Sequence, residues 1–463
     1  MISLRFDQLV TITGGQLRTA EHRHRTFTGV SQDSRTVETG QLFFAIRGDR
    51  NDGHQFIDQA VSRGAAGIVS QTGFFVERPL PPHTAVLEVP DTHTAMLHLA
   101  GEYLLSLKAK RLGITGSNGK TTTKEFAFRL LSARDRDIYR SPGNFNNLFG
   151  IPLALFSMPT STRLAVLEMG ISTPGEMARL AALVRPHLLA VTNVGPTHLE
   201  FLGTVEAVAR EKLQAMKYAE PDAALIVNAD DPVLMAEARR VHDRPITFAV
   251  AAEADYRPDS IRPVDGATAV LIESHTFRLP LFGQYQVQNL LAAYAIARTV
   301  GCRFDDFDTE SIELSTASMR GETIRAGEIT FISDCYNANP ESVKAGLASL
   351  AQVPSVGRKV VILGDMLELG EASPAYHREI GLALGACRFD LVIAVGPLST
   401  NLRDGAGEAG VAAESLHHFS HARACAEAIK DLLQPGDLVY LKGSRGIGLE
   451  TVLKQFPQEE GRS

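Results

Sequence analysis

Short apolar runs alternate with helical patterns along the central part of the chain. Buried strands are predicted at KRLGIT (110–115), RLAVLEMG (163–170), HLLAVTNVG (187–195) and AALIVN (223–228), with helical stretches between them. Strands that alternate with helices in this way are joined by right-handed crossovers, so the strands run parallel. The pattern therefore predicts a mostly parallel sheet with helices packed on it.

The pattern changes on both sides of this region. Near 267–281 the runs ATAVLIE and TFRLPL predict a hairpin turning at Ser-His, followed by a helix over 287–300. A second strand–helix series starts at EITFISD (328–334), whereas the first hundred residues mix short strands with Gly-rich turns and end in a helix over 92–108. We therefore expect an α/β protein with three domains: a mixed α/β domain (1–108), a central domain with a mostly parallel sheet (109–312) and a Rossmann-like domain (313–463).

Composition agrees with this organisation and excludes several classes of protein. At about 150 residues per domain, 463 residues correspond to about three domains. The 46 basic and 53 acidic residues give a net charge of −7, which argues against a general nucleic-acid binder. No apolar run is long enough to span a membrane, and four widely spaced cysteines indicate neither disulfides nor zinc. We expect a cytoplasmic monomer that binds neither nucleic acid nor membranes.

The segment G-I-T-G-S-N-G-K-T (113–121) carries the clearest chemical signal. Gly116 and Gly119 allow consecutive N–H groups to face one anion, and the helix that starts near Lys120 adds its positive end. Lys120 can then reach the β and γ phosphates, and the Thr121 hydroxyl can bind Mg²⁺. The first glycine stands one position too early for the generic G-x4-G-K-T pattern. The alternative is an ordinary strand-to-helix turn; we favour a nucleoside triphosphate site that makes this a P-loop domain.

Three further positions follow the predicted strands of the same domain. Glu168 ends one strand, His198 lies in the turn after the next, and Lys212 lies on the following helix. Because ligands of open parallel sheets bind beyond the carboxyl ends of the strands, all three are candidates for the nucleotide site. Taken singly, a loop histidine is more often solvated and Lys212 would be a surface lysine. The guanine-specific N-K-x-D motif is absent from the chain, which disfavours a GTPase.

Together these motifs resemble the Mur ligase family, the ATP-dependent peptide-bond formers of bacterial wall synthesis. T-G-S-N-G-K-T (115–121), L-E-M-G (167–170) and T-N-V-G-P-T-H-L-E-F-L-G-T with A-R-E-K (192–212) occur in the family's order, and the displaced glycine is the family's own form. The resemblance implies ATP as the nucleotide. It implies that the phosphates contact Thr115, Gly116, Ser117, Asn118, Gly119, Lys120, Thr121 and Thr122.

The resemblance also implies two Mg²⁺ ions and a modified lysine. One metal would be held by Thr121 and Glu168, and a second by His198 and Lys212. Lys212 matches the family's carbamylated lysine, in which CO₂ converts a cation into an anionic oxygen ligand. That conversion is physically reasonable, because an unmodified ammonium group would oppose a neighbouring metal ion.

Other stretches resemble the family member that joins D-alanyl-D-alanine to UDP-N-acetylmuramoyl-tripeptide. They are D-C-Y-N-A-N-P (334–340), L-G-D-M-L-E-L-G (363–370), K-G-S-R (442–445) and G-N-F-N-N (143–147). V-S-Q-D-S-R (30–35), with I-R-G-D-R-N-D-G-H after it, resembles that member's uridine-nucleotide-binding domain. The residues implied to bind these substrates are Ser31, Asp33, Ser34, Arg35, Asn144, Asn146, Asn147 and Arg445.

The resemblance places further ATP contacts outside the phosphate loop. Arg320 would meet the γ-phosphate, Asp334 and Asn337 lie in the ribose-side motif, and Asn289 corresponds to an adenine-side asparagine. The implied reaction passes through an acyl phosphate, with Lys120, Lys212, His198 and Arg320 as the catalytic residues. Alternatives are a sister ligase that adds the third residue, a folylpolyglutamate synthase, a kinase-like phosphotransferase, and a regulatory protein that binds ATP without chemistry.

Overall fold

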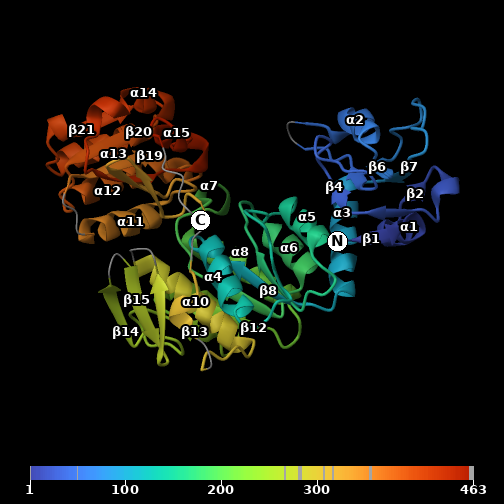
Figure 1. Cartoon of the computed structure of the whole chain (residues 1–463), viewed down its shortest axis with the longest axis horizontal. Helices are drawn as coiled ribbons and strands as arrows, with labels where there is room; N and C mark the ends of the chain where they lie inside the picture. Colours follow the sequence, from blue (N-terminus) through green and yellow to red (C-terminus); the bar gives the residue numbers. More distant parts are fainter. Residues whose placement is uncertain are drawn as a thin grey trace.

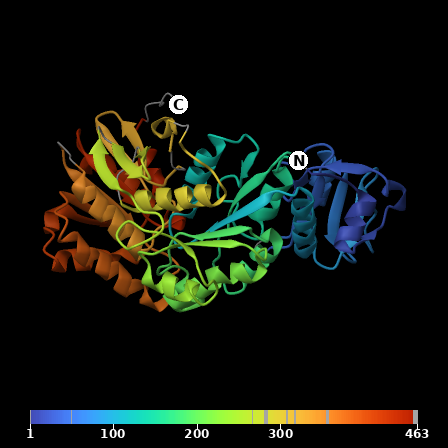
Figure 2. The ribbon, with the colours of Figure 1, turned by 90° about the horizontal axis from the view of Figure 1, so that it is seen from below.

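The computed structural model describes residues 2–48, 51–264, 267–279, 284–305, 308–314, 318–353 and 357–457, with the backbone alone at Gln284 and Tyr285. The chain forms three units in a row. The N-terminal and C-terminal units lie at opposite ends, and the central unit lies between them (Figures 1 and 2). Within the described residues, no helix is long and apolar enough to cross a membrane.

The N-terminal unit is built on a sheet in the order β2-β7-β6-β5-β4, in which β4 to β7 run parallel and β2 is antiparallel. A separate antiparallel pair, β1 and β3, lies beside it. The elements are β1 Ser3–Arg5, α1 Phe6–Thr13, β2 Gln16–Leu17, β3 Thr26–Thr28, β4 Val30–Ser31, β5 Leu42–Phe44, α2 Ile57–Ser62, β6 Gly67–Gln71, β7 Ala85–Val89 and α3 Thr92–Ser106.

The central unit contains the parallel sheet that the sequence predicts. Its order is β13-β12-β11-β8-β10-β9, and a small antiparallel sheet, β14-β15-β16, lies next to it. The elements are β8 Lys110–Thr115, α4 Lys120–Ser132, β9 Ile138–Arg140, α5 Gly150–Ser157, β10 Leu164–Glu168, α6 Glu176–Val184, β11 Leu188–Val191, α7 Leu199–Leu202, α8 Val205–Leu213, β12 Ala224–Asn228, α9 Pro232–Ala238, β13 Ile246–Phe248, β14 Ser260–Val264, β15 Ala267–Ile272, β16 His275–Leu279 and α10 Gln284–Thr299.

The C-terminal unit is a second doubly covered sheet in the order β17-β18-β22-β19-β20-β21, parallel except for the edge strand β17. Strand order that departs from chain order reflects crossovers through helices, as in Rossmann-like folds. The elements are β17 Glu322–Ala326, β18 Ile329–Ser333, α11 Pro340–Gln352, β19 Lys359–Gly364, α12 Ser373–Leu384, β20 Leu391–Val395, α13 Ser399–Glu408, β21 Leu416–Phe419, α14 Ala422–Leu432, β22 Leu438–Lys442 and α15 Glu450–Leu453.

The predicted hairpin forms, but its turn lies one residue earlier than expected. Glu273 and Ser274 adopt φ of +46° and +71°, and His275 already pairs with Ile272. Two consecutive positive φ values make the tight turn whose twist matches a two-residue hairpin. The antiparallel edge strands β14 and β17 were not predicted, because short half-exposed strands lack the continuous apolar run of a buried parallel strand.

The apolar core is continuous between the N-terminal and central units. One cluster of buried residues includes Phe6 and Leu99 from the first unit and Phe156, Leu180 and Leu213 from the second. Helix α3 packs against α5 and α6 of the central unit. The clusters of the C-terminal unit, by contrast, contain residues of that unit alone among those the structure describes.

Candidate active site

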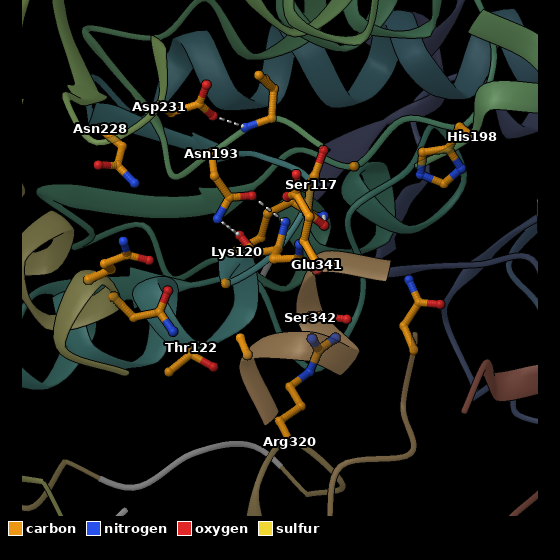
Figure 3. Close-up of a pocket in the computed structure, with 18 of the residues that line it drawn as sticks. Ser117, Lys120, Thr122, Asn193, His198, Asn228, Asp231, Arg320, Glu341 and Ser342 are labelled. Atoms are coloured by element: carbon orange, nitrogen blue, oxygen red, sulfur yellow. Dashed lines mark hydrogen bonds between the residues drawn. The ribbon is translucent and has the colours of Figure 1, made fainter. Parts of the chain in front are cut away.

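A cleft of about 650 Å³ opens where the carboxyl ends of the central strands meet the C-terminal unit. Its central side carries Lys120 and Glu168, and its C-terminal side carries Arg320, Asp334 and Lys442. In Figure 3 the Arg320 guanidinium points across the cleft toward the loop that holds Lys120. The cleft therefore combines residues from parts of the chain some two hundred positions apart.

The phosphate loop leaves β8 at Thr115 and enters α4 at Lys120. Gly116 and Gly119 have φ of +148° and +80°, which side-chain-bearing residues rarely adopt. A Cβ at Gly119 would also collide with the amide of Asn289, and one at Gly116 with the Thr192 hydroxyl. The first N–H groups of α4 have no intrahelical partner, so the loop and helix start form an anion-binding end.

Asn193, which the sequence analysis did not select, fixes the shape of this loop. Its side-chain oxygen accepts from the Asn118 N–H at 2.8 Å, and its side-chain nitrogen donates to the Asn118 carbonyl at 3.3 Å. The hydroxyl of Thr192 donates to the same carbonyl at 2.5 Å. Thr192 and Asn193 of the T-N-V-G motif thus hold the backbone of the phosphate loop in place, a role that spacing in the sequence does not reveal.

Lys120 lies folded back on its own loop. Its Nζ donates to the Gly116 carbonyl at 2.7 Å and to the Ser117 carbonyl at 3.2 Å. Burial lowers the pKa of Lys120 to about 8, the Glu168 carboxylate opposes this shift, and the Arg320 guanidinium adds to it. An anion bound in the loop would add negative charge beside this half-buried ammonium group.

Glu168, at the end of β10, is held by side chains on both carboxylate oxygens. Oε2 accepts from the Thr121 hydroxyl at 2.8 Å, and Oε1 accepts from the Asn146 amide at 2.8 Å. A hydroxyl beside a carboxylate is the hard-oxygen donor set that Mg²⁺ prefers, so these two residues fit the predicted metal. The structure thus brings together Thr121 and Glu168, which the resemblance gave as ligands of one metal, and it places Asn146 beside them.

Lys124 is a functional candidate that the sequence analysis missed. Its side chain is fully buried, and Nζ donates to the carbonyls of Ser141 and Gly143 at 2.9 and 2.8 Å. It also lies 3.7 Å from Glu168 Oε2. Lys124 therefore ties the loop that carries Asn146 to Glu168. The available signal was its position one turn after Lys120, on the same face of α4.

His198 and Lys212 occupy very different surroundings. His198 precedes α7 with a left-handed backbone, lines the cleft, and its Nδ1 lies 2.5 Å from Glu368 Oε2 of the C-terminal unit. Lys212 on α8 is 1% exposed, and its side chain forms no hydrogen bond with the described residues. Burial lowers the pKa of Lys212 well below its usual value, Lys120 adds to the shift and Glu211 opposes it. Within the described chain, no three His, Cys, Asp or Glu side chains form a ready metal cluster.

The C-terminal side of the cleft contains the other predicted ATP-side residues. The Arg320 guanidinium lies over the Tyr336 ring at 4.0 Å from its centre. Asp334 accepts from Lys442 Nζ at 2.7 Å and from the Tyr440 hydroxyl at 2.8 Å. Asn337 lines the same cleft, as does Asn289 on α10 from the central side.

A reciprocal amide pair joins the phosphate loop to this side. Asn339 Nδ2 donates to Asn118 Oδ1 at 2.7 Å, and Asn118 Nδ2 donates to Asn339 Oδ1 at 3.3 Å. Asn339, 2% exposed, also accepts from the Ser342 N–H at 2.9 Å and so caps α11. From this motif Asn337 was predicted to lie in the site and Asn339 was not, because an N-cap before a proline has an ordinary structural explanation.

The remaining predicted residues are scattered. Ser31, Asp33 and Arg35 share one turn of the N-terminal unit, where Arg35 pairs with Asp33 at 2.7 Å, and Ser34 donates to Gln59 at 2.7 Å. None of these four lines the cleft. Asn147 lines the cleft, and its side-chain oxygen accepts from the N–H groups of Phe149 and Gly150 at the start of α5. Asn144 is exposed, Arg445 pairs with Glu450 at 2.9 Å outside the cleft, and Thr115 and Thr121 are buried.

Comparison with known proteins agrees with this geometry. The chain matches the descriptions "Mur ligase family, catalytic domain" over residues 26–103, "Mur ligase middle domain" over 114–297 and "Mur ligase, glutamate ligase domain" over 319–445. It is 33% identical to the UDP-N-acetylmuramoyl-tripeptide–D-alanyl-D-alanine ligase of Bacillus subtilis (strain 168), covering 98% of this chain and 99% of that one.

Solved structures give the same result. The crystal structure I of MurF from Acinetobacter baumannii matches with a TM-score of 0.86 and 28% identity, covering 98% of each chain. MurF ligase from Thermotoga maritima in complex with ADP matches with a TM-score of 0.79 and 28% identity, covering 93% of this chain and 97% of that one. With a phosphate loop, a clamped carboxylate and three matching domains in one order, the chain belongs to the Mur ligase family.

Proposed function

We propose that this protein is an ATP-dependent ligase that joins D-alanyl-D-alanine to UDP-N-acetylmuramoyl-tripeptide. The observation that carries the proposal is the cleft in which the phosphate loop faces Arg320, Asp334 and Lys442. Relatives of the same length are named for this reaction, and a matching structure holds ADP. ATP, the UDP-linked tripeptide and the dipeptide are the proposed ligands of a monomeric, cytoplasmic enzyme. We retain 1–108, 109–312 and 313–463 as the proposed domain limits.

The proposed chemistry has two steps. A carboxylate oxygen of the tripeptide bonds to the γ-phosphorus of ATP, and the bond from that phosphorus to the β–γ bridging oxygen breaks, which releases ADP. The dipeptide amine then attacks the acyl carbon, the amine loses a proton, and the C–O bond to phosphate breaks. Phosphoryl transfer depends mainly on positioning and charge neutralisation, and phosphate is a far better leaving group than oxide.

The chain's cations are placed for that neutralisation. The N–H groups at the start of α4 bind the phosphates, Lys120 leaves its loop carbonyls for the β and γ oxygens, and Arg320 approaches the γ-phosphate from the other side. Thr121 and Glu168 would hold Mg²⁺, which neutralises phosphate charge when bound. Asn289 is proposed to contact the adenine side, and Asp334 and Asn337 the ribose side.

Lys212 is proposed to carry a carbamate. Because burial lowers the pKa of Lys212, the neutral amine is easier to form there, and its nitrogen can attack CO₂, form an N–C bond and lose a proton. The product is an anion at a position where Lys120 disfavours a cation. With His198, this group would supply the second Mg²⁺ site. Removal of bicarbonate and CO₂ should then lower turnover, and readdition should restore it.

The acyl substrate is proposed to span the N-terminal and central units. The turn with Ser31, Asp33, Ser34 and Arg35 would bind the uridine nucleotide, and Asn144, Asn146 and Asn147 would bind the peptide end near Glu168. Arg445 is proposed to contact the dipeptide. It lies outside the cleft in this structure, so that contact requires a shift of the loop between β22 and α15.

Phosphate release with mass analysis of the product tests the proposal. ATP, Mg²⁺ and UDP-N-acetylmuramoyl-tripeptide should release phosphate only when D-alanyl-D-alanine is present, and the product should gain the dipeptide less one water. Turnover with a single diamino acid or with a folate in place of these substrates would move the protein to a sister ligase. ADP formation without any amine requirement would indicate a phosphotransferase, and no turnover with any pair would indicate a binding protein.

A further inference from the structure

One side chain of the C-terminal unit reaches across to the histidine of the central unit. Glu368, in the loop after β19, accepts from Nδ1 of His198 at 2.5 Å. The backbone joins the same contact, since the Glu200 N–H donates to the Glu368 carbonyl at 3.4 Å. Gly370 packs against the backbone of Glu200, where a Cβ would be tight at 3.2 Å. The two units thus meet at His198 through a short hydrogen bond, with backbone contacts beside it.

Hydrogen bonds to other residues of the C-terminal unit fix the loop that carries Glu368. The Leu367 N–H donates to Ser444 Oγ at 2.9 Å, and the Met366 N–H donates to Nε2 of His377 at 2.9 Å. His377 is fully buried, and its Nδ1 donates to the Ser373 carbonyl at 2.8 Å. Since both nitrogens of His377 are used in one tautomer, this imidazole is a rigid support and leaves Glu368 at a defined position.

The backbone at both ends of the contact is unusual. His198 has φ of +55° and Glu368 has φ of +63°, a region that non-glycine residues rarely occupy. Such conformations cost energy and persist where the surrounding structure requires a particular side-chain direction. Here both of them aim the two side chains at each other across the interface.

The contact determines which nitrogen of His198 is available in the cleft. A carboxylate at Nδ1 holds the proton there, so the lone pair lies on Nε2. No described residue forms a hydrogen bond with Nε2, and His198 lines the cleft. A neutral histidine side chain in water favours the other tautomer, with the proton on Nε2, so the carboxylate reverses the intrinsic preference.

We infer that Glu368 is a positioning residue, supplied by the C-terminal domain, that presents Nε2 of His198 as an acceptor only when the two domains meet. The role of Nε2 as a metal ligand rests on the proposed function, whereas the tautomer and its dependence on Glu368 do not. Closure of the C-terminal domain would in this way complete the central domain's site through a side chain that never enters the cleft.

Nitrogen-15 spectra of histidine-labelled protein with ADP and Mg²⁺ bound test the inference directly. The His198 signals are identified by their loss in His198→Gln. In the unchanged protein, His198 should show the Nδ1–H tautomer. In Glu368→Ala the Nε2–H tautomer should become the major form, and Glu368→Gln, which keeps a hydrogen-bonding oxygen, should lie between the two. Glu371→Ala is the matched control, since Glu371 is exposed on the same loop and has no partner among the described residues.

Steady-state kinetics of the Glu368 variants provide the second test. Loss of such a supporting carboxylate typically costs about 10- to 100-fold in activity, so Glu368→Ala should lower kcat by that factor with the KM for ATP nearly unchanged. An unaltered His198 tautomer in Glu368→Ala would overturn the inference, whatever the activity. If the tautomer changes as expected but no dipeptide ligation is found even in the unchanged protein, the positioning role stands and the proposed function fails.

Discussion

The central unit meets its two neighbours in opposite ways. Against the N-terminal unit it shares one apolar core, and Tyr103 of α3 adds a hydrogen bond from its hydroxyl to the Met158 carbonyl at 2.9 Å. Against the C-terminal unit the contacts are polar, chiefly Asn118 with Asn339 and His198 with Glu368. No apolar cluster of the described residues joins these two units.

This difference indicates which joint moves. Apolar burial contributes roughly 25 cal/mol per Å² and is lost in full if the surfaces part, so the first two units behave as one body. Polar side chains that separate exchange their partners for water at little net cost. We therefore expect the C-terminal unit to be the part that opens to admit nucleotide and closes over it, as polar interdomain contacts generally permit.

The largest effect is expected in the apolar joint. Tyr103→Ala should lower the free energy of unfolding of the N-terminal and central units together by about 3–5 kcal/mol, as large-to-small core changes do. Tyr103→Phe should cost only about 0.5–1.5 kcal/mol, since it removes one hydrogen bond. Hydrogen exchange measured by mass spectrometry locates the loss.

The control for this prediction is Leu384→Ala, which lies in the separate core of the C-terminal unit. It should raise exchange in that unit alone. If Tyr103→Ala destabilised all three units equally, the C-terminal unit would be coupled to the central unit as strongly as the N-terminal unit is.

The amide pair gives the next largest effect. Asn339→Ala should destabilise the C-terminal unit by about 0.5–2 kcal/mol through loss of the α11 cap. Asn339→Ser keeps a capping oxygen but is too short to reach Asn118, so it should preserve stability and still weaken closure on ADP. Small-angle scattering with and without ADP measures the closure. Normal closure of Asn339→Ser would show that the pair contributes nothing to the joint.

Proton uptake on ADP binding reports on the charges that lie on the two sides of the same joint. The pKa of Lys120 is lowered to about 8, so most Lys120 side chains are deprotonated at pH 8.5 in the free protein. Bound phosphates should raise that pKa. ADP binding should therefore take up protons at pH 8.5 and almost none at pH 7. Calorimetry in buffers of different ionisation enthalpy measures the uptake.

Removing the guanidinium across the cleft should change that signal. Arg320 contributes to the lowered pKa of Lys120, so Arg320→Gln should raise this pKa and reduce the uptake at pH 8.5. Lys120→Met should abolish it. Uptake that is identical in Arg320→Gln would mean that the two domains do not sense each other's charge in the free protein.

The smallest effect is that of salt. Raising ionic strength from about 0.05 to 0.5 M screens the Glu368 carboxylate at its contact with His198, and such exposed charged contacts are worth about 0–1 kcal/mol, so it should slightly favour the open C-terminal arrangement. The N-terminal joint, which is apolar, should not respond. Fluorescence energy transfer between labels on α3 and α5, and between labels on α5 and α13, separates the two. A change in the distance between α3 and α5 would show that the N-terminal joint also responds to salt.

The sequence predicted the architecture well because its signals are local. Apolar runs followed by helical patterns located β8, β10 and β11, and the glycines of the phosphate loop need their backbone freedom regardless of distant partners. The short edge strands β14 and β17 carry no such signal. They were missed because their pairing depends on neighbours in space.

Site residues were predicted where a sequence motif carries them, including Arg320, Asp334 and Asn337 of the C-terminal unit, which line the cleft. Glu168 with Thr121 follows from strand ends and the family's motifs, and the structure places these two side chains 2.8 Å apart. Glu368 lies 170 residues from His198, and Asn339 lies 221 from Asn118, so nothing in local spacing indicates either pair. The hydrogen bonds that join the two units were therefore not predicted, although the C-terminal residues Arg320 and Asp334 of the cleft were.

Helix α3 also has a consequence for how the protein is made. Its apolar side packs against α5, which ends about fifty residues later in the chain, at Ser157. At a synthesis rate of about 5–20 residues per second, that side has no partner for roughly 3–10 s after it is translated. During this interval the nascent chain exposes the apolar side of α3 that later faces α5, so we expect a chaperone to bind the N-terminal hundred residues until α5 has been made.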